Sequence, residues 1–544
     1  MNCNQCGLQF EYFNAEKEAY NRADALLPVN CPQCRRLRHL IFRNEKNLFH
    51  NKSCLSAKKI ISLYPETSPF HIVDQNEWWS DKFDATLFAR NFDFNKPFFE
   101  QYKNLQKEVP RWARIVVNAE NSDFCNNSAN VKNCYLTFSS YESQDLYYCM
   151  RLFRCNDCVD CLNISDCQLC SMSADCKHCY NIHYSLLCNS CYDSYFIFDC
   201  KTSKNCIMTA QARNKEYLIR GKEYSKAEYE KHKKEFLAQL ANNPDSIKKE
   251  FLELLKSAYH KNLNMIKAEN CLGNFINDSK NIINVFYTID SEDCVNVYDS
   301  SALKDCYDNS YNEKSELCVE IDTAYEMYNS KFCTYSITMA DSAYCDQCDH
   351  LTECFGCIGL KKQQNRILNK QYSAEDYKKM LAKIKTHMEH TGEWGKPFPH
   401  NLTPFPYNIT LAYELAPLKK EEALKQGYMW HDEEKQEMPK EKYNLPKTAV
   451  EADESICEKI LVCEKTGKPY KIIPQELKFY KKFGLPLPRV TPDQRYKELR
   501  NLQPPKKLID ATCGLCKSPI KTVYPPEWNY KIICEKCYLE KIYE

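Results

Sequence analysis

Glycine is scarce in this sequence, which has only 11 among 544 residues, and histidine is almost as rare with 12. Loops that cradle phosphate need closely spaced glycines, and the sequence has no phosphate loop and no G-x-G-x-x-G, H-E-x-x-H or G-x-S-x-G pattern. So little glycine is also unlike flexible, disordered filler. We therefore expect an ordered protein without catalytic residues, and we identify no small-molecule substrate.

Long hydrophobic runs and a charge excess are also lacking. No apolar run approaches the ~18 residues of a membrane-spanning helix, and the start, MNCNQCGLQF, does not resemble a signal peptide. The 74 basic residues balance 73 acidic ones, which excludes a strong overall attraction to nucleic acid or membrane but leaves room for a local patch. We expect several domains, because the chain is too long for one core, and a cytoplasmic location, where thiols stay reduced.

Cysteine is what the sequence has in quantity, with 34 residues. At the N-terminus, 24 residues separate Cys3-x-x-Cys6 from Cys31-x-x-Cys34. At the C-terminus, 17 residues separate one C-x-x-C pair from the next. Four thiolates supplied by two such turns suit tetrahedral zinc, so we predict two structural Zn²⁺ sites. The predicted ligands are Cys3, Cys6, Cys31, Cys34, Cys513, Cys516, Cys534 and Cys537.

Both ends are predicted to be tandems of two ribbons, because the first module returns 460 residues later. Cys3 and Tyr20 match Cys463 and Tyr480, but three of the four ligands are lost in the later copy. Conversely, the ligands Cys534 and Cys537 fall where the N-terminal part has acidic residues, Asp74 and Glu77. We therefore expect residues 1–80 to form a zinc ribbon followed by a degenerate one, and residues 451–544 to form a degenerate ribbon followed by a zinc ribbon.

The middle of the chain carries cysteines separated by multiples of three, with a longer period of 21 residues. Such a period predicts a repeat architecture, and we expect two β-solenoids with 21-residue coils, at 121–214 and 269–362. Val297, Met327 and Met339 replace cysteine in the second run, which favours packing over metal binding. The cysteines of the first run are Cys134, Cys149, Cys155, Cys158, Cys161, Cys167, Cys170, Cys176, Cys179, Cys188, Cys191, Cys200 and Cys206.

The two predicted solenoids are copies of one another. The I-x-x-K-x-Y-S-x-x-x-Y pattern that starts at Ile219 recurs at Ile367, an offset of 148 residues. Helical caps are expected at 215–268, opened by a capping box at Ser225, and at 363–392, opened by Ser373. We expect a strap at 81–120 to cover the first coil of the first solenoid, and a Pro-rich extended linker at 393–450.

A basic segment follows the second cysteine pair of the first ribbon and is predicted to be helical. Its four arginines, Arg35, Arg36, Arg38 and Arg43, can form a patch that contacts nucleic-acid phosphate. The same segment is also compatible with a plain solvated helix face.

The first ribbon resembles treble-clef zinc ribbons through its C-x-x-C-G-x-x-F (3–10) and C-P-x-C-R (31–35) segments. The whole chain resembles a family of uncharacterised proteins of candidate-phyla bacteria. The resemblance rests on the ribbon, Phe42-Arg43-Asn44-Glu45, the two Y-S-x-x-x-Y segments, the cysteine repeats, and a segment with Val73, Asp74, Gln75, Trp78 and Trp79. It implies no known activity. A CoA-transferase label attached to such chains finds no supporting motif here.

Two functions from different classes fit these observations. The first is a non-enzymatic, zinc-binding scaffold that binds a macromolecular partner, either a protein or RNA and the ribosome through the basic ribbon helix. The second is metal handling or redox buffering by the cysteine ladder, since thiolates suit soft metals such as Cu(I).

Overall fold

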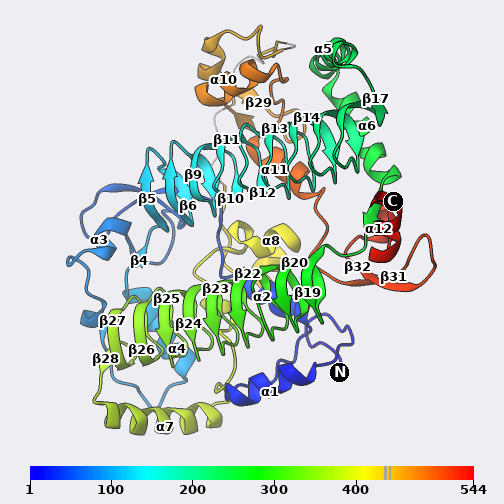
Figure 1. The fold of residues 1–544 in the computed structure, drawn as a ribbon. Coiled ribbons are helices and arrows are strands. Elements are labelled where there is room, and N and C mark those ends of the chain that lie inside the picture. The colour runs from blue at the N-terminus through cyan, green and yellow to red at the C-terminus, as the bar shows by residue number, and fades with distance from the viewer. Residues whose placement is uncertain (434–437, 440–442, 447, 544) are drawn as a thin grey trace. The chain divides into compact units, whose positions relative to one another are not determined.

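The computed structural model describes residues 1–433, 438–439, 443–446 and 448–543 (Figure 1). It is a mixed α/β structure with many strands in parallel sheets. The chain divides into two compact units. Unit 1 comprises Met1–Ile115, Leu263–Asp432 and Lys506–Leu508, and unit 2 comprises Val116–Asn262, Glu433–Pro505 and Ile509–Glu544. None of the described helices is long and apolar enough to cross a membrane.

Unit 2 contains the first run of cysteines, in a stretch that we call the first array (residues 116–219). Nearly all of its parallel pairs join residues 12 positions apart, as in Met150 with Leu162 and Cys158 with Leu146. The strands are β5 (Val116–Glu120), β6 (Phe124–Asn126), β7 (Ser128–Lys132), β8 (Tyr135–Phe138), β9 (Tyr141–Tyr147), β10 (Met150–Phe153), β11 (Asn156–Val159), β12 (Leu162–Ser165), β13 (Tyr180–His183), β14 (Tyr192–Phe198), β15 (Lys204–Ala210) and β16 (Glu216–Ile219).

Unit 1 contains the second run, the second array (residues 265–367), with the same spacing, as in Ser310 with Asp322. Its early bulge occurs at Gly273, where a Cβ atom would lie 1.8 Å from the Val285 carbonyl oxygen. The strands are β19 (Met265–Glu269), β20 (Leu272–Lys280), β21 (Ile283–Ile289), β22 (Tyr298–Lys304), β23 (Ser310–Glu316), β24 (Asp322–Tyr328), β25 (Thr334–Ala340), β26 (Asp349–Phe355) and β27 (Lys361–Ile367).

The prediction of a 21-residue coil is wrong, because paired residues on neighbouring parallel strands are 12 positions apart. Both 21 and 12 are multiples of three, and the backbone conformation repeats every three residues. In the first array nearly every third residue has a positive φ, as at Asp157, Asp160 and Asn163. About half of these residues in the first array are Asn or Asp, which tolerate this left-handed conformation better than most residues, and the others include Leu136 and Tyr148. Asn and Asp side chains also join along the array, as Asn133 Nδ2 donates to Asp145 Oδ1 at 3.1 Å.

The interior of the first array is lined by every third residue, and nearly all of its small polar side chains donate to the carbonyl oxygen two residues earlier. Cys167 Sγ donates to the Ser165 carbonyl oxygen at 3.2 Å, and Ser173 Oγ donates to the Ser171 carbonyl oxygen at 2.9 Å. The serine Oγ also accepts a hydrogen bond from the backbone N–H of the residue 12 positions later, as Ser143 Oγ does from Cys155 at 3.0 Å. Cysteine, serine and threonine are therefore interchangeable inward residues, and apolar ones fill the rest.

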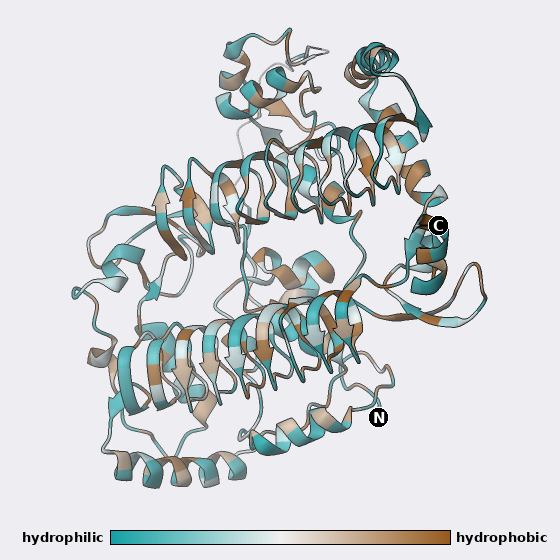
Figure 2. Cartoon of the chain, in the orientation of Figure 1, coloured by the Kyte–Doolittle hydropathy of each residue, from teal (hydrophilic) through white to brown (hydrophobic). Residues whose placement is uncertain are grey.

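Helices cover the array ends, as the serine caps predict. Helices α5 (Lys226–Asn242) and α6 (Pro244–Ser257) pack Phe236 and Phe251 on Phe196 of the first array. Ser225 forms the predicted capping box. Helix α7 (Ala374–His390) buries Tyr377, Ile384 and Met388, while its ribbon is otherwise largely hydrophilic (Figure 2). The short strands β17 (Lys222–Glu223) and β28 (Lys370–Gln371) pair antiparallel with the last strand of each array.

Two connecting segments differ from expectation. The strap, with α4 (Phe98–Glu108), packs Phe98 against Tyr344 and Phe355 of the second array rather than covering the first coil of the first array. Much of the expected Pro-rich linker is part of the core of unit 1, because aromatic residues between its prolines are buried: Phe405 is 0% exposed and Phe398 is 6% exposed. The short helices α8 (Leu411–Leu415) and α9 (Lys420–Lys425) follow. Part of 434–447 lies outside the described residues.

The ribbons repeat one layout at each end of the chain. Hairpin β1 (Phe49–Lys52) with β2 (Lys59–Ser62) corresponds, at the same offset of 460, to β31 (Ile509–Thr512) with β32 (Pro519–Thr522), pair for pair. The N-terminal elements are α1 (Asn14–Arg22), α2 (Pro32–Leu40), β3 (Ile72–Val73), α3 (Gln75–Trp79) and β4 (Arg111–Trp112). The C-terminal ones are β29 (Leu461–Val462), β30 (Pro469–Tyr470), α10 (Pro474–Phe483), α11 (Pro492–Arg500), β33 (Lys531–Ile533), which pairs with β18 (Tyr259–Lys261), and α12 (Glu535–Tyr543).

Candidate metal centres

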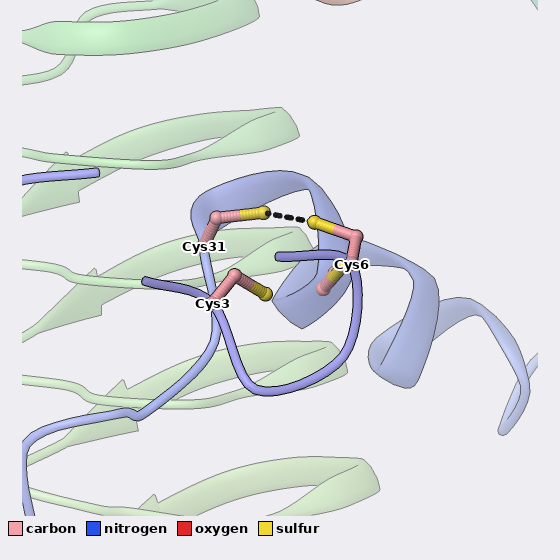
Figure 3. A group of neighbouring side chains, drawn as sticks. Cys3, Cys6 and Cys31 are labelled. Atoms are coloured by element: carbon pink, nitrogen blue, oxygen red, sulfur yellow. Dashed lines mark hydrogen bonds between the residues drawn. The ribbon is translucent and has the colours of Figure 1, made fainter. Parts of the chain in front are cut away.

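The first group of four cysteines meets as the sequence predicts. Cys3 and Cys6 lie in a tight turn that closes at Gly7, whose φ is 74°. Cys31 caps α2, and Cys34 lies in its first turn. The four Sγ atoms lie within 4.8 Å of one another, with Cys6 Sγ and Cys31 Sγ 3.7 Å apart. Figure 3 shows the Cys3, Cys6 and Cys31 side chains converging.

The backbone around this group favours thiolate at Cys3. Burial raises the pKa of the Cys3 thiol, but hydrogen bonds from the backbone N–H groups of Cys31, Cys6 and Gln5 outweigh it and lower the pKa to about 6. Thiolate is the form that binds metal. Four convergent thiols, three of them buried, with an N–H-stabilised charge match a structural tetrahedral ion, with no further position for substrate.

The second group has the same construction at the C-terminus. Cys513 and Cys516 occupy the turn between β31 and β32, and Cys534 and Cys537 lie at the start of α12. Their Sγ atoms also lie within 4.8 Å of one another, and Cys516 and Cys534 are 3.7 Å apart. Burial raises the pKa of Cys513, whereas backbone N–H groups, that of Cys534 foremost, lower it to about 6. Each group can therefore hold one metal ion.

The array thiols are a different population. Among the described residues, the two terminal groups are those whose ligand atoms converge in this way, and no set of array thiols joins them. All cysteines are free. Burial raises the pKa of Cys134 and of Cys206 to about 12. Cys134 and Cys206 are therefore protonated donors to main-chain oxygens, which fits packing rather than metal binding. Within the same array, hydrogen bonds from Cys179 and Cys188 lower the pKa of Cys191 to about 4.

The four arginines predicted to contact nucleic acid face the second array instead of solvent. Arg35 is 1% exposed and pairs with Glu16 Oε1 at 2.6 Å and with Asp308. The guanidinium of Arg36 lies 4.6 Å from the ring centroid of Tyr298. Arg38 pairs with Glu320 Oε2 at 2.5 Å, and its side chain is 19% exposed. Arg43 pairs with Glu45 at 2.6 Å and is 1% exposed. Such buried charges are committed to internal partners.

Sequence reasoning missed the role of Arg35, which unit 2 repeats at Arg495. Arg495 pairs with Asp160 Oδ2 at 2.8 Å and with Glu476 Oε1 at 2.9 Å. Tyr480 donates to Asp160, as Tyr20 donates to Asp308. We call each set an arginine clasp: Arg35, Glu16, Tyr20 and Asp308 in unit 1, and Arg495, Glu476, Tyr480 and Asp160 in unit 2.

The signal for the clasps was present in the offsets. The ribbon members of the two clasps differ by 460, and the array members, Asp160 and Asp308, differ by 148. Both were the offsets already found for the two duplications. The offsets alone do not say which ribbon contacts which array. The structure places the ribbon that contains Arg35 on the second array and the ribbon that contains Arg495 on the first array.

No protein-family model matches the chain, and a search of curated proteins finds no relative. The family resemblance of the sequence therefore stays an expectation. What the structure supports is a Cys-rich chain with two four-cysteine groups that can each hold a metal ion. The first group lies in the ribbon that carries the Arg35 clasp, whereas the Arg495 clasp belongs to the ribbon that precedes the second group.

Proposed function

We propose that this protein is a non-enzymatic scaffold in which two zinc ribbons stabilise a pair of β-solenoids that bind a macromolecular partner. The observation that carries the proposal is the division of the thiols. Eight of them converge in the two four-cysteine groups, whereas array thiols such as Cys167 and Cys179 donate to main-chain carbonyls inside the core. The metal chemistry is thus confined to fold-stabilising positions.

Zinc is the ion that suits the two groups. Four thiolates in a closed tetrahedral set are typical of structural zinc, which supplies on the order of 10 kcal/mol toward folding small modules. The solenoid assignment rests on the 12-residue parallel register, which brings equivalent residues of successive turns side by side.

A protein is the partner that we favour over RNA. The arginines on which RNA contact depended are buried or engaged in ion pairs. In addition, residues 270–353 of the second array contain sixteen Asp and Glu but only four Lys. Five of the acidic residues, among them Asp308 and Glu320, are buried, which leaves eleven that are exposed or half-buried. An acidic wall repels phosphate and suits a basic protein surface.

Metal content of untagged, anaerobically purified protein tests the proposal, measured by elemental mass spectrometry. We expect two zinc ions per chain, unchanged when Cys155, Cys167, Cys179 and Cys191 are all replaced by serine. Clearly more than two ions, lost in that variant, would instead assign metal handling to the array.

Partner class is tested separately by in-cell cross-linking before and after nuclease treatment. Cross-linked species that persist after nuclease support a protein partner. Species that collapse after nuclease, while a variant with Arg38→Glu keeps its fold and loses them, would restore the RNA interpretation.

A further inference from the structure

The two ribbons that lack a four-cysteine group keep the backbone frame of a metal-binding turn. In each ribbon, the residue at the first ligand position donates its N–H to the carbonyl five residues later and accepts from the N–H four residues later. The first of these distances is 2.9 Å for Cys3 to Leu8, Ser53 to Lys58, Cys463 to Lys468 and Cys513 to Ser518. The residue that closes the turn has a positive φ in all four cases: Gly7, Ala57, Gly467 and Lys517.

The second half of the frame is also retained in the ribbon of residues 49–79. Asp74 caps α3 and accepts from the Trp78 N–H at 2.9 Å, as Cys534 accepts from the Tyr538 N–H at 2.9 Å. The two halves are joined by the same bond, 2.7 Å from Cys54 N to the Ile72 oxygen and 2.8 Å in its counterpart from Gly514 to Ile532.

Four side chains stand at the ligand positions of this frame. At the offset of 460, Ser53, Ser56, Asp74 and Glu77 correspond to Cys513, Cys516, Cys534 and Cys537. The match extends to environment at the first three positions, which are buried, exposed and half-buried in both ribbons.

These side chains are already bonded to one another across the two halves. Ser53 Oγ donates to the Glu77 carboxylate and accepts from the Asp74 N–H at 3.2 Å. Hydrogen bonds from Ser53 and then Ser56 lower the pKa of Glu77. Lys58 Nζ lies 3.5 Å from Asp74 Oδ2, whose partner oxygen accepts from the Asn76 N–H at 2.9 Å. Two hydroxyl groups and two carboxylates thus stand at the four ligand positions and are held by hydrogen bonds, while the exposed Lys58 ammonium lies beside Asp74.

We propose that Ser53, Ser56, Asp74 and Glu77 are the ligand positions of a vacated zinc site, and that their hydrogen bonds perform the cross-link that the ion performs in the last ribbon. The other metal-free ribbon follows the same rule, since Cys463 keeps the first position and a hydrogen bond from Thr466, at the second, lowers the pKa of Cys463 against its burial. The inference rests on the proposed function in one respect, namely that the Cys513 group holds zinc.

The test restores the ligands in the full chain. The variant Ser53→Cys, Ser56→Cys, Asp74→Cys, Glu77→Cys is expected to bind one zinc ion more than the natural chain, and to give thiolate-to-cobalt charge-transfer absorption when loaded with Co²⁺. The pair Ser56→Cys, Glu77→Cys is the matched control, and with two ligands it should add no tightly bound ion. A folded quadruple variant whose metal content equals that of the natural chain would overturn the proposal.

A second measurement covers the case in which the quadruple variant does not fold. Ser53→Ala and Glu77→Gln should each lower hydrogen-exchange protection of β1 and β2 at least several-fold, whereas Lys58→Met, which removes only an exposed ammonium, should not. Unchanged protection in both variants would show that the hydrogen bonds do not cross-link the ribbon. The natural chain is measured in parallel. An absence of zinc from the Cys513 group would refute the proposed function and the comparison with a zinc-bound ribbon, whereas the hydrogen-exchange result for Ser53 and Glu77 would still decide whether their hydrogen bonds cross-link the ribbon.

Discussion

Removal of the Arg495 guanidinium should release the C-terminal ribbon from the first array. The side chain is 5% exposed, and its two partners, Asp160 and Glu476, are 2% and 0% exposed. Arg495→Met would leave two carboxylates buried without a cation. Breaking a buried pair by removing one partner costs about 3–5 kcal/mol, so we expect the local opening free energy of α10 and α11 to fall by about that amount.

Hydrogen exchange followed by mass spectrometry measures this opening directly, because a chain of two units need not unfold in one step. Arg489→Met is the matched control: its pair with Glu464 is 3.2 Å long, but the two side chains are 42% and 45% exposed, so its loss should cost at most about 1 kcal/mol. Adding Asp160→Asn and Glu476→Gln to Arg495→Met removes the unpaired charges and should restore most of the protection. The reasoning is refuted if Arg495→Met lowers the protection of α10 and α11 no more than Arg489→Met does, or if the triple variant protects these helices no better than Arg495→Met alone.

Three further outcomes follow from the same contacts. Burial raises the pKa of Glu476 from 4.5 to about 7, so between these pH values the folded state holds a proton that the unfolded state releases. Hydrogen-exchange protection of α10, corrected for the intrinsic exchange rate, should therefore fall as the pH rises from about 4.5 to 7 and level off above pH 7. Glu476→Gln should flatten this pH profile. In the first array, Cys167→Ser should lower the free energy of unfolding in denaturant by less than about 1 kcal/mol, because Ser143 and Ser203 make the same hydrogen bond. Cys167→Leu should lower it by about 1–3 kcal/mol through overpacking. Equal losses in the two variants would contradict the hydrogen-bond account. Cys31→Ser should lower the metal content by one ion per chain and leave the C-terminal group loaded, and loss of both ions would show that the groups are coupled.

The four-cysteine groups were predictable because metal ligation is local: two short turns with fixed spacing specify the donor set whatever surrounds them. The offsets of 460 and 148 were equally visible. The number of residues between paired positions of the array was not predictable. The inward positions accept Cys, Ser, Thr and aliphatic residues alike, so sequence matches recur at any multiple of three. Only the hydrogen-bond register, Met150 with Leu162, selects 12.

The basic segment shows where sequence reasoning loses information. Arg35 and its neighbours read as a surface patch, because their acidic partners lie far away in the chain: Asp308 is 273 residues from Arg35, and Glu320 is 282 residues from Arg38. The same holds for Phe398 and Phe405, because the prolines beside them predicted an extended linker and gave no sign that these rings are buried. Long-range burial was not encoded in local composition.

The pairing of ribbons with arrays needs an explanation, since the two clasps use equivalent residues and Arg35 would fit Asp160 as well as Asp308. Glu320 supplies the distinction. It accepts from Arg38 at 2.5 Å and lies 2.5 Å from His39 Nε2, whereas the equivalent position of the first array is Met172 and that of Arg38 in the C-terminal ribbon is Glu498. A C-terminal ribbon on the second array would bring Glu498 to Glu320, and like charges at a buried contact cost several kcal/mol.

Charge reversal tests this selection. Glu320→Arg should lower hydrogen-exchange protection of α2 by placing a second guanidinium beside Arg38, and adding Arg38→Glu should recover it by restoring an opposite pair. Protection of α11, which has its own clasp, should stay unchanged in both variants. If the double variant protects α2 no better than Glu320→Arg alone, then the Arg38–Glu320 pair does not select the array, and the choice must reside in the packing of Arg36 on Tyr298.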